Sequence, residues 1–521
     1  MKIVLLAHCH YLVLSYLWKL KQINMTVLKV GFIGLGRIAD VHFPAYINNT
    51  KARIYAVCDA DESLALSRKQ EVGAEKHYTN YHDLLNDTNV DAVEILLPQK
   101  FHEECVIAAA KSGKHIAIQK PMTISLESAQ RMINAAKENN VILKVTDNYC
   151  FYPPFIFAKK LIEQGEIGEP INIRISFVSG NGGWKIPSNS WEWRVKENAE
   201  GRGFQTFDHG HHLWATAWFF FGEVERVVSW IDTTDGFLDC PSVMMWKYKN
   251  SSKYGTCEFV HASDLNIPSK YYANDEWLQI TGSKGIIFIN RCTGLIHKEP
   301  VVSLFNNDGW TYFDDIKSDW GEGFIGAANN FTAAIKGEEK PMLTAEQGLE
   351  ILKFNLAISK SSRERREVYL DEMTKTNPRK FTIKTIRKEL KERYPSKSIF
   401  SSFFGENTSK YAPQAKELTY KMIEGFNGNA VKEWKSIIGL HLTQEGNTKE
   451  IIMGFVIESG KIQIIEGAIP KEAIMTIKSS CGTWAAILLK KKKLEMAFIQ
   501  GKIKIEGKAE EGLKLRSAFG I

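Results

Sequence analysis

The chain has 521 residues, of which 44% are hydrophobic, 24% charged and 11% aromatic. This length and composition are typical of a globular protein with about three or four domains, and they exclude a long disordered chain, a collagen-like repeat and a small disulfide-stabilised scaffold. Outside residues 3–20, no stretch approaches the ~18–20 apolar residues that a membrane span needs, which excludes a multi-spanning membrane protein.

The net charge of +7 is unevenly distributed along the chain. Residues 375–521 contain 27 Lys and Arg against 15 Glu and no Asp, a net charge of +12, whereas residues 1–374 carry −5. This asymmetry predicts two modules with different partners. No two of the eight cysteines have the C-x-x-C spacing, so we expect reduced, unpaired thiols and a cytoplasmic location.

Residues 1–24 form a mostly apolar extension. Three interpretations are open: an extension that is non-native or dispensable, a membrane-associating segment, or a signal peptide. The first is favoured, because no small-residue cleavage site follows the apolar run and a predicted strand begins directly after Met25.

Residues 25–147 begin with a glycine-rich turn between a strand and a helix. Residues 27–33 are predicted as a buried strand, and Gly34-Leu-Gly36-Arg-Ile-Ala39 follows directly. In this G-x-G-x-x-A pattern the first glycine permits the tight turn and the second lets the backbone approach a pyrophosphate. The free N–H groups at the helix start then face the phosphates, so the pattern predicts a dinucleotide-binding domain.

The next predicted strand, residues 53–58, ends at Asp59, which lies 25 positions after Gly34. A carboxylate near this distance bonds the ribose hydroxyls of the adenosine half of the cofactor. Because the same charge repels a 2′-phosphate, NAD is favoured over NADP. The alternation then continues into a doubly wound parallel sheet, with strands at 92–97, 115–118 and 141–145 and helices at 102–112 and 125–139.

Residues 148–372 are predicted as a second α/β domain. A strand at 171–178 precedes an apolar helix over 214–221, and strands then dominate to about residue 290, including an antiparallel hairpin over 277–289. Two helices, at 323–336 and 344–361, close the domain.

Five stretches in this order resemble the Gfo/Idh/MocA family of oxidoreductases. The resemblance covers residues 27–370 and implies that an open, mostly antiparallel sheet follows the Rossmann domain, that its face forms the substrate site, and that the protein is a homo-oligomer, a dimer or tetramer. The stretches are Gly34-Leu-Gly-Arg-Ile-Ala-Asp-Val-His42, Pro98-Gln-Lys-Phe-His102, Gln119-Lys-Pro121, Asn148-Tyr-Cys-Phe-Tyr-Pro153 and Gly203-Phe-Gln-Thr-Phe-Asp-His-Gly-His-His212.

The resemblance also implies catalytic roles. Lys120 is expected between nicotinamide and substrate, bonded to the reacting oxygen, where an ammonium can stabilise alkoxide-like charge. Asp208 and His212 have the i, i+4 spacing that places both on one face of a helix, with His212 as general acid/base and Asp208 orienting the site. Gln119 stands where the family usually has Glu, a departure that can lower the pKa of Lys120 or loosen its placement.

Cofactor and substrate contacts are expected from the same motifs. His102 either touches the cofactor or caps its helix, and the tryptophans near 184–193 either stack on a sugar ring or pack in the core or a subunit interface. The expected cofactor contacts are Gly34, Gly36, Arg37, Ile38, Asp59, Pro98, His102, Gln119 and Lys120. The expected substrate contacts are Asn148, Tyr149, Trp193, Arg194 and His209.

A metal site is not expected, although three histidines lie close to Asp208. His209, His211 and His212 cannot all share one helical face, and the family needs no metal. Nucleic-acid binding is not expected either, because the basic segments lack interleaved aromatic residues.

Residues 373–413 are predicted as a linker with a basic helix, and residues 414–521 as a separate α+β domain. The ending Ala497-Phe-Ile-Gln-Gly-Lys-Ile-Lys-Ile-Glu-Gly507, followed by a predicted helix, resembles the sterol carrier protein type of lipid-binding domain. The resemblance implies a pocket for an acyl, sterol or other apolar ligand, while a docking or oligomerisation role stays open. The run Lys490–Lys493 is either a solvated loop or a peripheral contact with an anionic membrane.

Together these patterns predict an NAD(P)-dependent oxidoreductase. It would transfer a hydride between nicotinamide and a secondary alcohol or ketone of a sugar, polyol or cyclitol. The alternative is a cofactor-bound carrier or sensor, in which the C-terminal domain binds an apolar ligand and the dehydrogenase module does not turn over. Gln119 is the feature that favours this alternative.

Overall fold

The computed structural model describes residues 27–184, 204–232, 238–374, 408–431, 434–492 and 502–507, with residues 494, 497, 518 and 519. The chain divides into two compact units, residues 1–383 and 384–521, called here the first and the second unit. In the described ranges, no helix is both long and apolar enough to cross a membrane. The predicted extension over 1–24 and the predicted basic linker helix lie outside the described residues.

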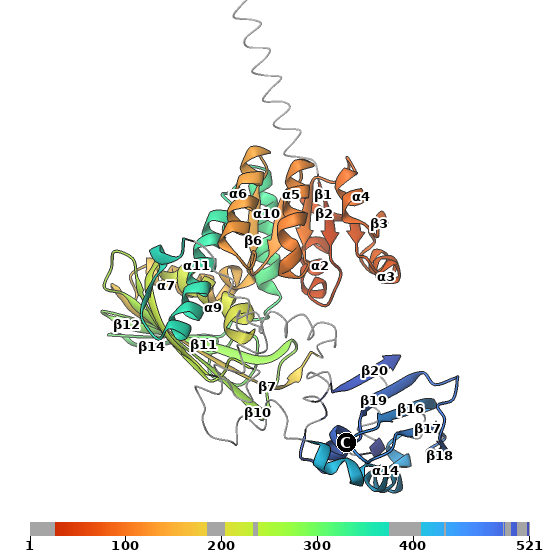
Figure 1. The fold of residues 1–521 in the computed structure, drawn as a ribbon. Helices are drawn as coiled ribbons and strands as arrows, with labels where there is room; N and C mark the ends of the chain where they lie inside the picture. Colours follow the sequence, from red (N-terminus) through yellow and green to blue (C-terminus); the bar gives the residue numbers. More distant parts are fainter. Residues whose placement is uncertain are drawn as a thin grey trace, which may run out of the picture. The chain divides into compact units, whose positions relative to one another are not determined.

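The first unit begins with a six-stranded parallel sheet of order β3-β2-β1-β4-β5-β6 (Figure 1). This order confirms the predicted doubly wound sheet, although the half-exposed β3 was not predicted because it has no apolar run. The strands are β1 (Leu28–Ile33), β2 (Ala52–Cys58), β3 (Lys76–Tyr78), β4 (Ala92–Ile95), β5 (His115–Gln119) and β6 (Leu143–Thr146). The connecting helices are α2 (Ala39–Ile47), α3 (Glu62–Val72), α4 (Tyr81–Asn86), α5 (His102–Lys111) and α6 (Leu126–Glu138).

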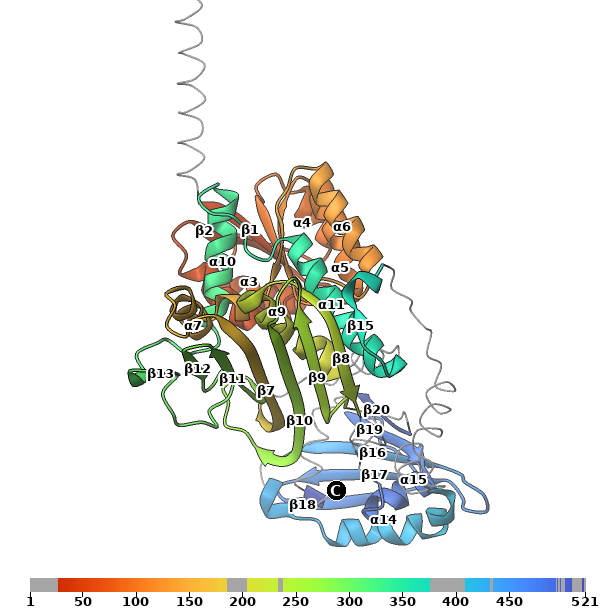
Figure 2. The same cartoon turned by 90° about the vertical axis from the view of Figure 1, so that its left-hand side faces the viewer.

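A nine-stranded, mostly antiparallel sheet follows, in the order β14-β13-β12-β11-β7-β10-β9-β8-β15 (Figure 2). Within it β7 and β10 run parallel, and β11 and β12 form the predicted hairpin. The strands are β7 (Pro170–Gly183), β8 (Val224–Ile231), β9 (Ser242–Tyr248), β10 (Tyr254–Asn266), β11 (Tyr272–Gly282), β12 (Gly285–Ile289), β13 (Val302–Asn306), β14 (Gly309–Phe313) and β15 (Val368–Tyr369).

Helices α7 (Pro153–Glu163), α9 (Gly210–Phe221) and α11 (Ala345–Glu364) pack against this second sheet. The buried ring of Trp214 in α9, for example, contacts Trp246 and Phe259 on the neighbouring strands. Among the side chains on the sheet's other face, Trp230 is 75% exposed and Met245 52%. The expected homo-oligomer would bury such residues, and it stays a prediction.

Helix α10 (Glu322–Ile335) returns to the first sheet and covers it. Its Phe331 packs on Ala92 of β4 and Ala117 of β5, and the carbonyl of Ala327 accepts a hydrogen bond from the fully buried Lys144 of β6 at 3.0 Å. A parallel sheet needs cover on both faces, and here the cover comes from late in the chain. The two domains predicted to divide at residues 147 and 148 therefore share one core.

The second unit is a five-stranded sheet of order β18-β17-β16-β19-β20 with two α-helices described. Its core centres on Trp484, whose indole N–H donates to the Thr419 hydroxyl at 3.0 Å. The elements are α14 (Ala415–Glu424), β16 (Ser436–Thr443), β17 (Ile451–Glu458), β18 (Lys461–Glu466), β19 (Met475–Ser480), α15 (Cys481–Leu488) and β20 (Ile503–Gly507). Most of the predicted final helix lies outside the described residues, and the membrane contact of the lysine run stays a prediction.

Because each unit has its own core, we expect Trp484→Ala to destabilise the second unit alone, by about 3–5 kcal/mol. Calorimetry should show one unfolding transition moving to lower temperature while the other stays in place. Trp310→Ala is the matched control, because Trp310 is 52% exposed on the edge strand β14 and its loss should cost no more than about 0.5 kcal/mol. A common shift of all transitions in Trp484→Ala would contradict the separation of the cores.

Candidate active site

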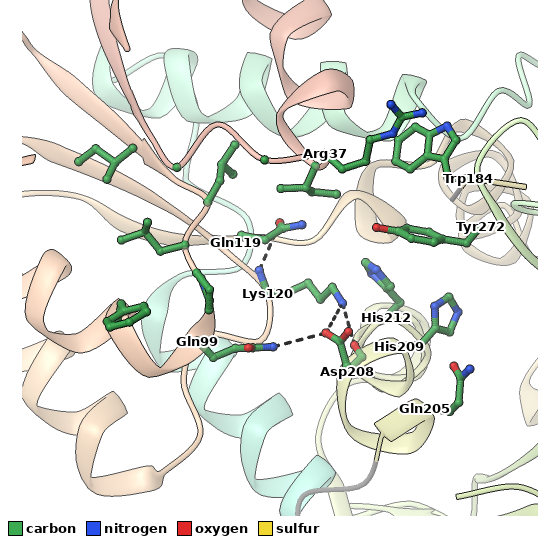
Figure 3. Close-up of a pocket in the computed structure, with 18 of the residues that line it drawn as sticks. Arg37, Gln99, Gln119, Lys120, Trp184, Gln205, Asp208, His209, His212 and Tyr272 are labelled. Carbon is green, nitrogen blue, oxygen red and sulfur yellow. Dashed lines mark hydrogen bonds and ion pairs between the residues drawn. The ribbon is translucent and has the colours of Figure 1, made fainter. Parts of the chain in front are cut away.

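A cavity of about 900 Å³ lies in the first unit, where the carboxyl ends of the parallel strands face the ends of β7 and β11. One wall comes from the turns after β1, β2, β4 and β5, and the opposite wall from the second sheet and the segment 205–212 (Figure 3). Ligands of open α/β sheets bind in this crevice at the carboxyl edge of the strands. The cavity therefore lies where a bound ligand is expected.

The turn after β1 has the shape that a dinucleotide requires. Gly34 has a φ of +90°, and a Cβ there would lie 2.9 Å from the carbonyl oxygen of Leu96, so only glycine fits without strain. A Cβ on Gly36 would meet nothing within 4 Å, which leaves room for a pyrophosphate against the backbone. The Leu35 N–H donates to Asp59 Oδ2 at 2.9 Å and orients that carboxylate at the end of β2. These residues fit a dinucleotide such as NAD.

Most of the predicted cofactor contacts lie together on this side of the cavity. Arg37 extends from the glycine-rich turn, and its guanidinium lies 4.6 Å over the ring of Trp184 from β7's end (Figure 3). The predicted residues that line the cavity are Gly34, Gly36, Arg37, Ile38, Asp59, Pro98, Gln119 and Lys120.

His102 lies elsewhere, which corrects its predicted cofactor contact. The ring is fully buried, with its two nitrogens 3.0 Å from the carbonyl oxygen of Met122 and 2.7 Å from that of Leu97. Burial lowers its pKa. The side chain thus ties the start of α5 to the turns after β4 and β5, and it supports Pro98 and Lys120 from behind. The predicted motif marked the turn correctly but did not indicate which way this side chain points.

Lys120 reaches across the cavity to the segment before α9. Its ammonium donates to the backbone carbonyl of Asp208 at 2.7 Å and to the Asp208 carboxylate at 3.1 Å (Figure 3). The amide of Gln99 also donates to that carboxylate, at 3.4 Å, and the Gln119 side chain accepts from the Lys120 backbone N–H. The amide of Gln99 thus contacts the ion pair, and a second uncharged amide, Gln119, stands at the position where the resembling family usually has Glu.

Asp208 and His212 do not share one α-helical face, which corrects the predicted spacing argument. Residues Phe204–His209 form a π-helical turn, and α9 begins only at Gly210. The buried Asp239 carboxylate accepts from the backbone N–H of Gln205 at 2.6 Å and of Thr206 at 2.9 Å, holding the start of this turn. Both Asp208 and His212 still line the cavity, but they bond to different partners. Such turns recur at functional sites and have no simple sequence signal.

His212 is held by a carboxylate that sequence reasoning missed. Its Nδ1 donates to Asp147 Oδ1 at 2.8 Å, and its ring stacks on Tyr149 with centroids 4.3 Å apart. Burial lowers the pKa of His212 to about 4, and the charge of Lys120 adds to this, whereas Asp147 opposes it. Asp147 directly follows β6, so its position at the carboxyl end of a parallel strand was the available signal.

Asn148 and Tyr149 support the site instead of lining it. Asn148 is 1% exposed and donates to the carbonyl of Trp320 at 3.4 Å, while Tyr149 is fully buried behind His212. The structure thus places both predicted substrate contacts behind the cavity wall. Predicted contacts Trp193 and Arg194 lie outside the described residues.

His209 does line the cavity, and it pairs with Glu276 of β11. Its Nε2 donates to Glu276 Oε1 at 2.6 Å, and the fully buried carboxylate also accepts from Asn274 and Thr293. Burial alone would raise the pKa of Glu276, but the bonds from His209 and Thr293 outweigh it and lower that pKa. In the described part of the chain, no group of three His, Cys, Asp or Glu side chains is arranged to hold a metal ion.

Three aromatic side chains from distant parts of the chain complete the substrate side of the cavity. They are Trp184 after β7, Tyr272 on β11 and Trp320 before α10. The Trp184 and Tyr272 ring centroids are 5.4 Å apart, and those of Tyr272 and Trp320 are 6.3 Å apart. Sequence reasoning missed Tyr272 and Trp320, because nothing in their local sequence connects them to the motifs.

We expect the His212 imidazole to titrate near pH 4, far below the ordinary value of 6.5, because it is buried beside Lys120. Since its pKa is lower in the folded than in the unfolded protein, its contribution to stability is complete above about pH 6.5 and is lost as the pH falls toward 4. An NMR titration of ¹⁵N-histidine-labelled protein measures the midpoint, and His212→Asn assigns the resonance. A midpoint between about 6 and 7 would contradict the buried environment.

Comparison with known families agrees with this architecture. The oxidoreductase family described as having an NAD-binding Rossmann fold matches residues 28–147, and its C-terminal alpha/beta domain matches residues 159–370. The SCP-2 sterol transfer family matches residues 421–520.

Individual relatives cover the same region. The chain is 27% identical over 362 residues to the myo-inositol 2-dehydrogenase of Thermotoga maritima. That alignment covers 66% of this chain and 99% of the relative. It is 24% identical over 356 residues to the scyllo-inositol 2-dehydrogenase (NAD(+)) of Bacillus subtilis. That alignment covers 66% of this chain and 96% of the relative. An oxidoreductase structure from Agrobacterium radiobacter, in complex with NAD+, L-tartaric acid and magnesium, has the same fold, with a TM-score of 0.59 at 22% identity over 67% of this chain and 100% of that one.

The two oxidoreductase matches together span more than half of the 521 residues and contain the whole cavity described above. The chain therefore belongs to the Gfo/Idh/MocA oxidoreductase family, with an NAD-binding Rossmann domain and a C-terminal domain of the SCP-2 sterol transfer family.

Proposed function

We propose that this protein is an NAD-dependent dehydrogenase that oxidises a secondary alcohol of a sugar, polyol or cyclitol, or reduces the corresponding ketone. The observation that carries the proposal is the meeting of Lys120 and His212 in one cavity with the dinucleotide-type turn. NAD+, when bound there by the glycine-rich turn and Asp59, supplies the acceptor for the hydride that leaves the carbinol carbon. The carboxylate of Asp59 at the ribose position supports NAD over NADP.

Lys120 would stabilise the oxygen of the reacting alcohol. Its side chain is 10% exposed, and two contacts with Asp208 hold its ammonium in a defined position in the cavity. A preorganised cation beside the oxygen stabilises the alkoxide-like charge that develops as the hydride leaves. Asp208 would orient this cation and keep the pair neutral overall.

His212 would accept the hydroxyl proton. Its Nδ1 is used by Asp147, so Nε2 is the nitrogen left for the substrate. The imidazole is neutral at pH 7 because burial lowers its pKa to about 4, so its Nε2 has a free lone pair that can accept the proton as the alcohol loses it.

The rest of the cavity suits a ring that carries several hydroxyl groups. The wall formed by Trp184, Tyr272 and Trp320 offers flat faces to the C–H surface of such a ring, and the polar groups of His209 and Asn274 can bond its hydroxyls. Relatives named inositol dehydrogenases, and a levoglucosan dehydrogenase that is 29% identical over 218 residues, support this substrate class. The alternative of a carrier without turnover is not favoured, because these relatives are named as enzymes.

We expect Lys120→Met and His212→Asn each to lower kcat/KM for alcohol oxidation by roughly 10²–10⁴-fold, since each removes a group at the reacting oxygen or its proton. Reduction of NAD+ at 340 nm across a panel of inositols, sugars and polyols measures the effect. The matched controls are Lys111→Met, on the exposed end of α5, and His82→Asn, on an exposed position of α4, both outside the cavity lining. Wild-type turnover in both active-site variants would refute the assignment.

We further propose that the second unit holds an acyl, sterol or similar apolar ligand, which would bring an apolar or lipid-linked substrate close or anchor the enzyme. The match of residues 421–520 to the SCP-2 sterol transfer family supports this, and a docking role is the competing function.

Native mass spectrometry of the full chain tests this second proposal. We expect a lipid-sized adduct that persists in Trp310→Ala and is lost in Trp484→Ala, because Trp484 lies in the core of the second unit. Bound NAD(H) without any lipid adduct, before and after exposure to a mixture of fatty acids and sterols, would favour the docking role instead.

A further inference from the structure

We propose that Asp147 is a positioning residue of this active site, which fixes the tautomer and the rotation of His212 so that the unprotonated Nε2 faces the substrate. The proposal rests on the dehydrogenase function proposed above and deepens it. Asp147 itself does not line the cavity, so it would act through His212 and not on the substrate directly.

The ionised Asp147 carboxylate can only accept hydrogen bonds. Asp147 is fully buried at the end of β6, and its two oxygens receive three donors. Oδ1 accepts from His212 Nδ1 at 2.8 Å and from the backbone N–H of Tyr149 at 3.1 Å, and Oδ2 accepts from His211 Nδ1 at 3.1 Å. The bonds from the two histidines outweigh burial and lower the pKa of Asp147, so the group is ionised at neutral pH.

The tautomer of His212 follows from these bonds. Because an ionised carboxylate has no proton to give, Nδ1 of His212 must carry the hydrogen. A neutral imidazole has one N–H, so its Nε2 keeps a free lone pair on the side away from Asp147. In the opposite tautomer the proton would sit on Nε2, and the substrate hydroxyl would have no base to receive its proton.

The orientation of the ring is fixed by two contacts of different kinds, a stacking contact and a hydrogen bond. Tyr149 stacks beneath the imidazole with an interplanar angle of 16°, which sets the plane of the ring. The bond to Asp147 then sets the rotation within that plane. The carboxylate cannot swing away, because the Tyr149 N–H and His211 hold it from two other directions.

The charge of Asp147 would also stabilise the imidazolium that forms when His212 takes a proton. Burial, Lys120 and His209 each disfavour the positive charge of the ring. Asp147 is the group that opposes them. Without it, His212 would be a weaker base in a site that already suppresses its protonation.

A merely structural role is the competing explanation, since a paired buried carboxylate also stabilises the fold. That role predicts a lower melting temperature but normal turnover for each folded molecule. The positioning role predicts a loss confined to kcat, with a changed protonation pattern on His212.

Asp147→Asn tests the two explanations, because the amide keeps the shape but can donate to His212 Nδ1 as well as accept from it. We expect kcat for alcohol oxidation to fall roughly 10²–10⁴-fold, with the KM values for NAD+ and alcohol within about threefold of wild type. Asp87→Asn is the matched control, because its carboxylate is likewise nearly buried, at 6% exposed, and ion-paired, with Lys76 at 3.0 Å, but it does not line the cavity, so we expect its kcat to stay close to the wild-type value. Equal losses in the two variants, or wild-type kcat in Asp147→Asn, would overturn the proposal.

A spectroscopic readout tests the same proposal without a measurement of turnover. In ¹⁵N-histidine-labelled wild-type protein at pH 7, we expect His212 to show a protonated Nδ1 and an unprotonated Nε2, and Asp147→Asn to lose this pattern. A protonated Nε2 in the wild type would overturn the positioning role by itself. If the wild type has the expected tautomer but oxidises no alcohol in the panel, the proposed function fails while the positioning geometry stands.

Discussion

The buried pairing of Asp147 with His211 and His212 is the interaction on which the arrangement of the first unit depends. Asp147 directly follows β6, an edge strand of the parallel sheet, and the two histidines lie in the first turn of α9, which packs against the second sheet. A carboxylate with no solvent contact is costly unless every oxygen is satisfied, and breaking such a pair commonly costs several kcal/mol. The pairing therefore joins the dinucleotide-binding half to the half that carries Asp208 and His209, and it sets the distance between them.

The cavity lies where the carboxyl ends of the parallel strands face the ends of β7 and β11 of the second sheet. Helix α10 covers the parallel sheet from late in the chain, so the halves cannot separate without exposing Phe331 and the buried Lys144. The pyrophosphate-type turn, Asp59 and Lys120 follow strands of the parallel sheet, while the other residues that would meet the substrate come from the second sheet, the π-helical turn, α9 and the segment before α10. Rigid support on both sides is what precise placement of reacting groups requires.

The charges around Lys120 show how the site differs from the pattern that its family motif suggests. Gln119 and Gln99 are nearly buried amides, and Asp208 supplies the carboxylate that bonds the ammonium. The placement of Lys120 thus depends on the π-helical turn and, through Gln205 and Thr206, on the buried Asp239. Because residue 119 carries a neutral amide, no carboxylate adjacent in sequence pairs with Lys120. Its ammonium is held instead by the carbonyl and the carboxylate of Asp208, from the opposite wall of the cavity.

The local sequence determined the glycine-rich turn, Asp59 and Lys120, because the carboxyl ends of parallel strands always meet at one edge and so bring their following residues together. It also determined most strands and helices, through apolar runs and helical periodicity. The tertiary structure alone decided the rest. Whether His102 and Tyr149 face the cavity or its supporting wall depends on side-chain direction, which spacing does not encode. Asp208 and His212 met different partners because a π-helical turn replaced the expected α-helix. Trp320, Tyr272 and Glu276 joined the site from distant strands and turns, since packing, and not sequence proximity, brings such residues together.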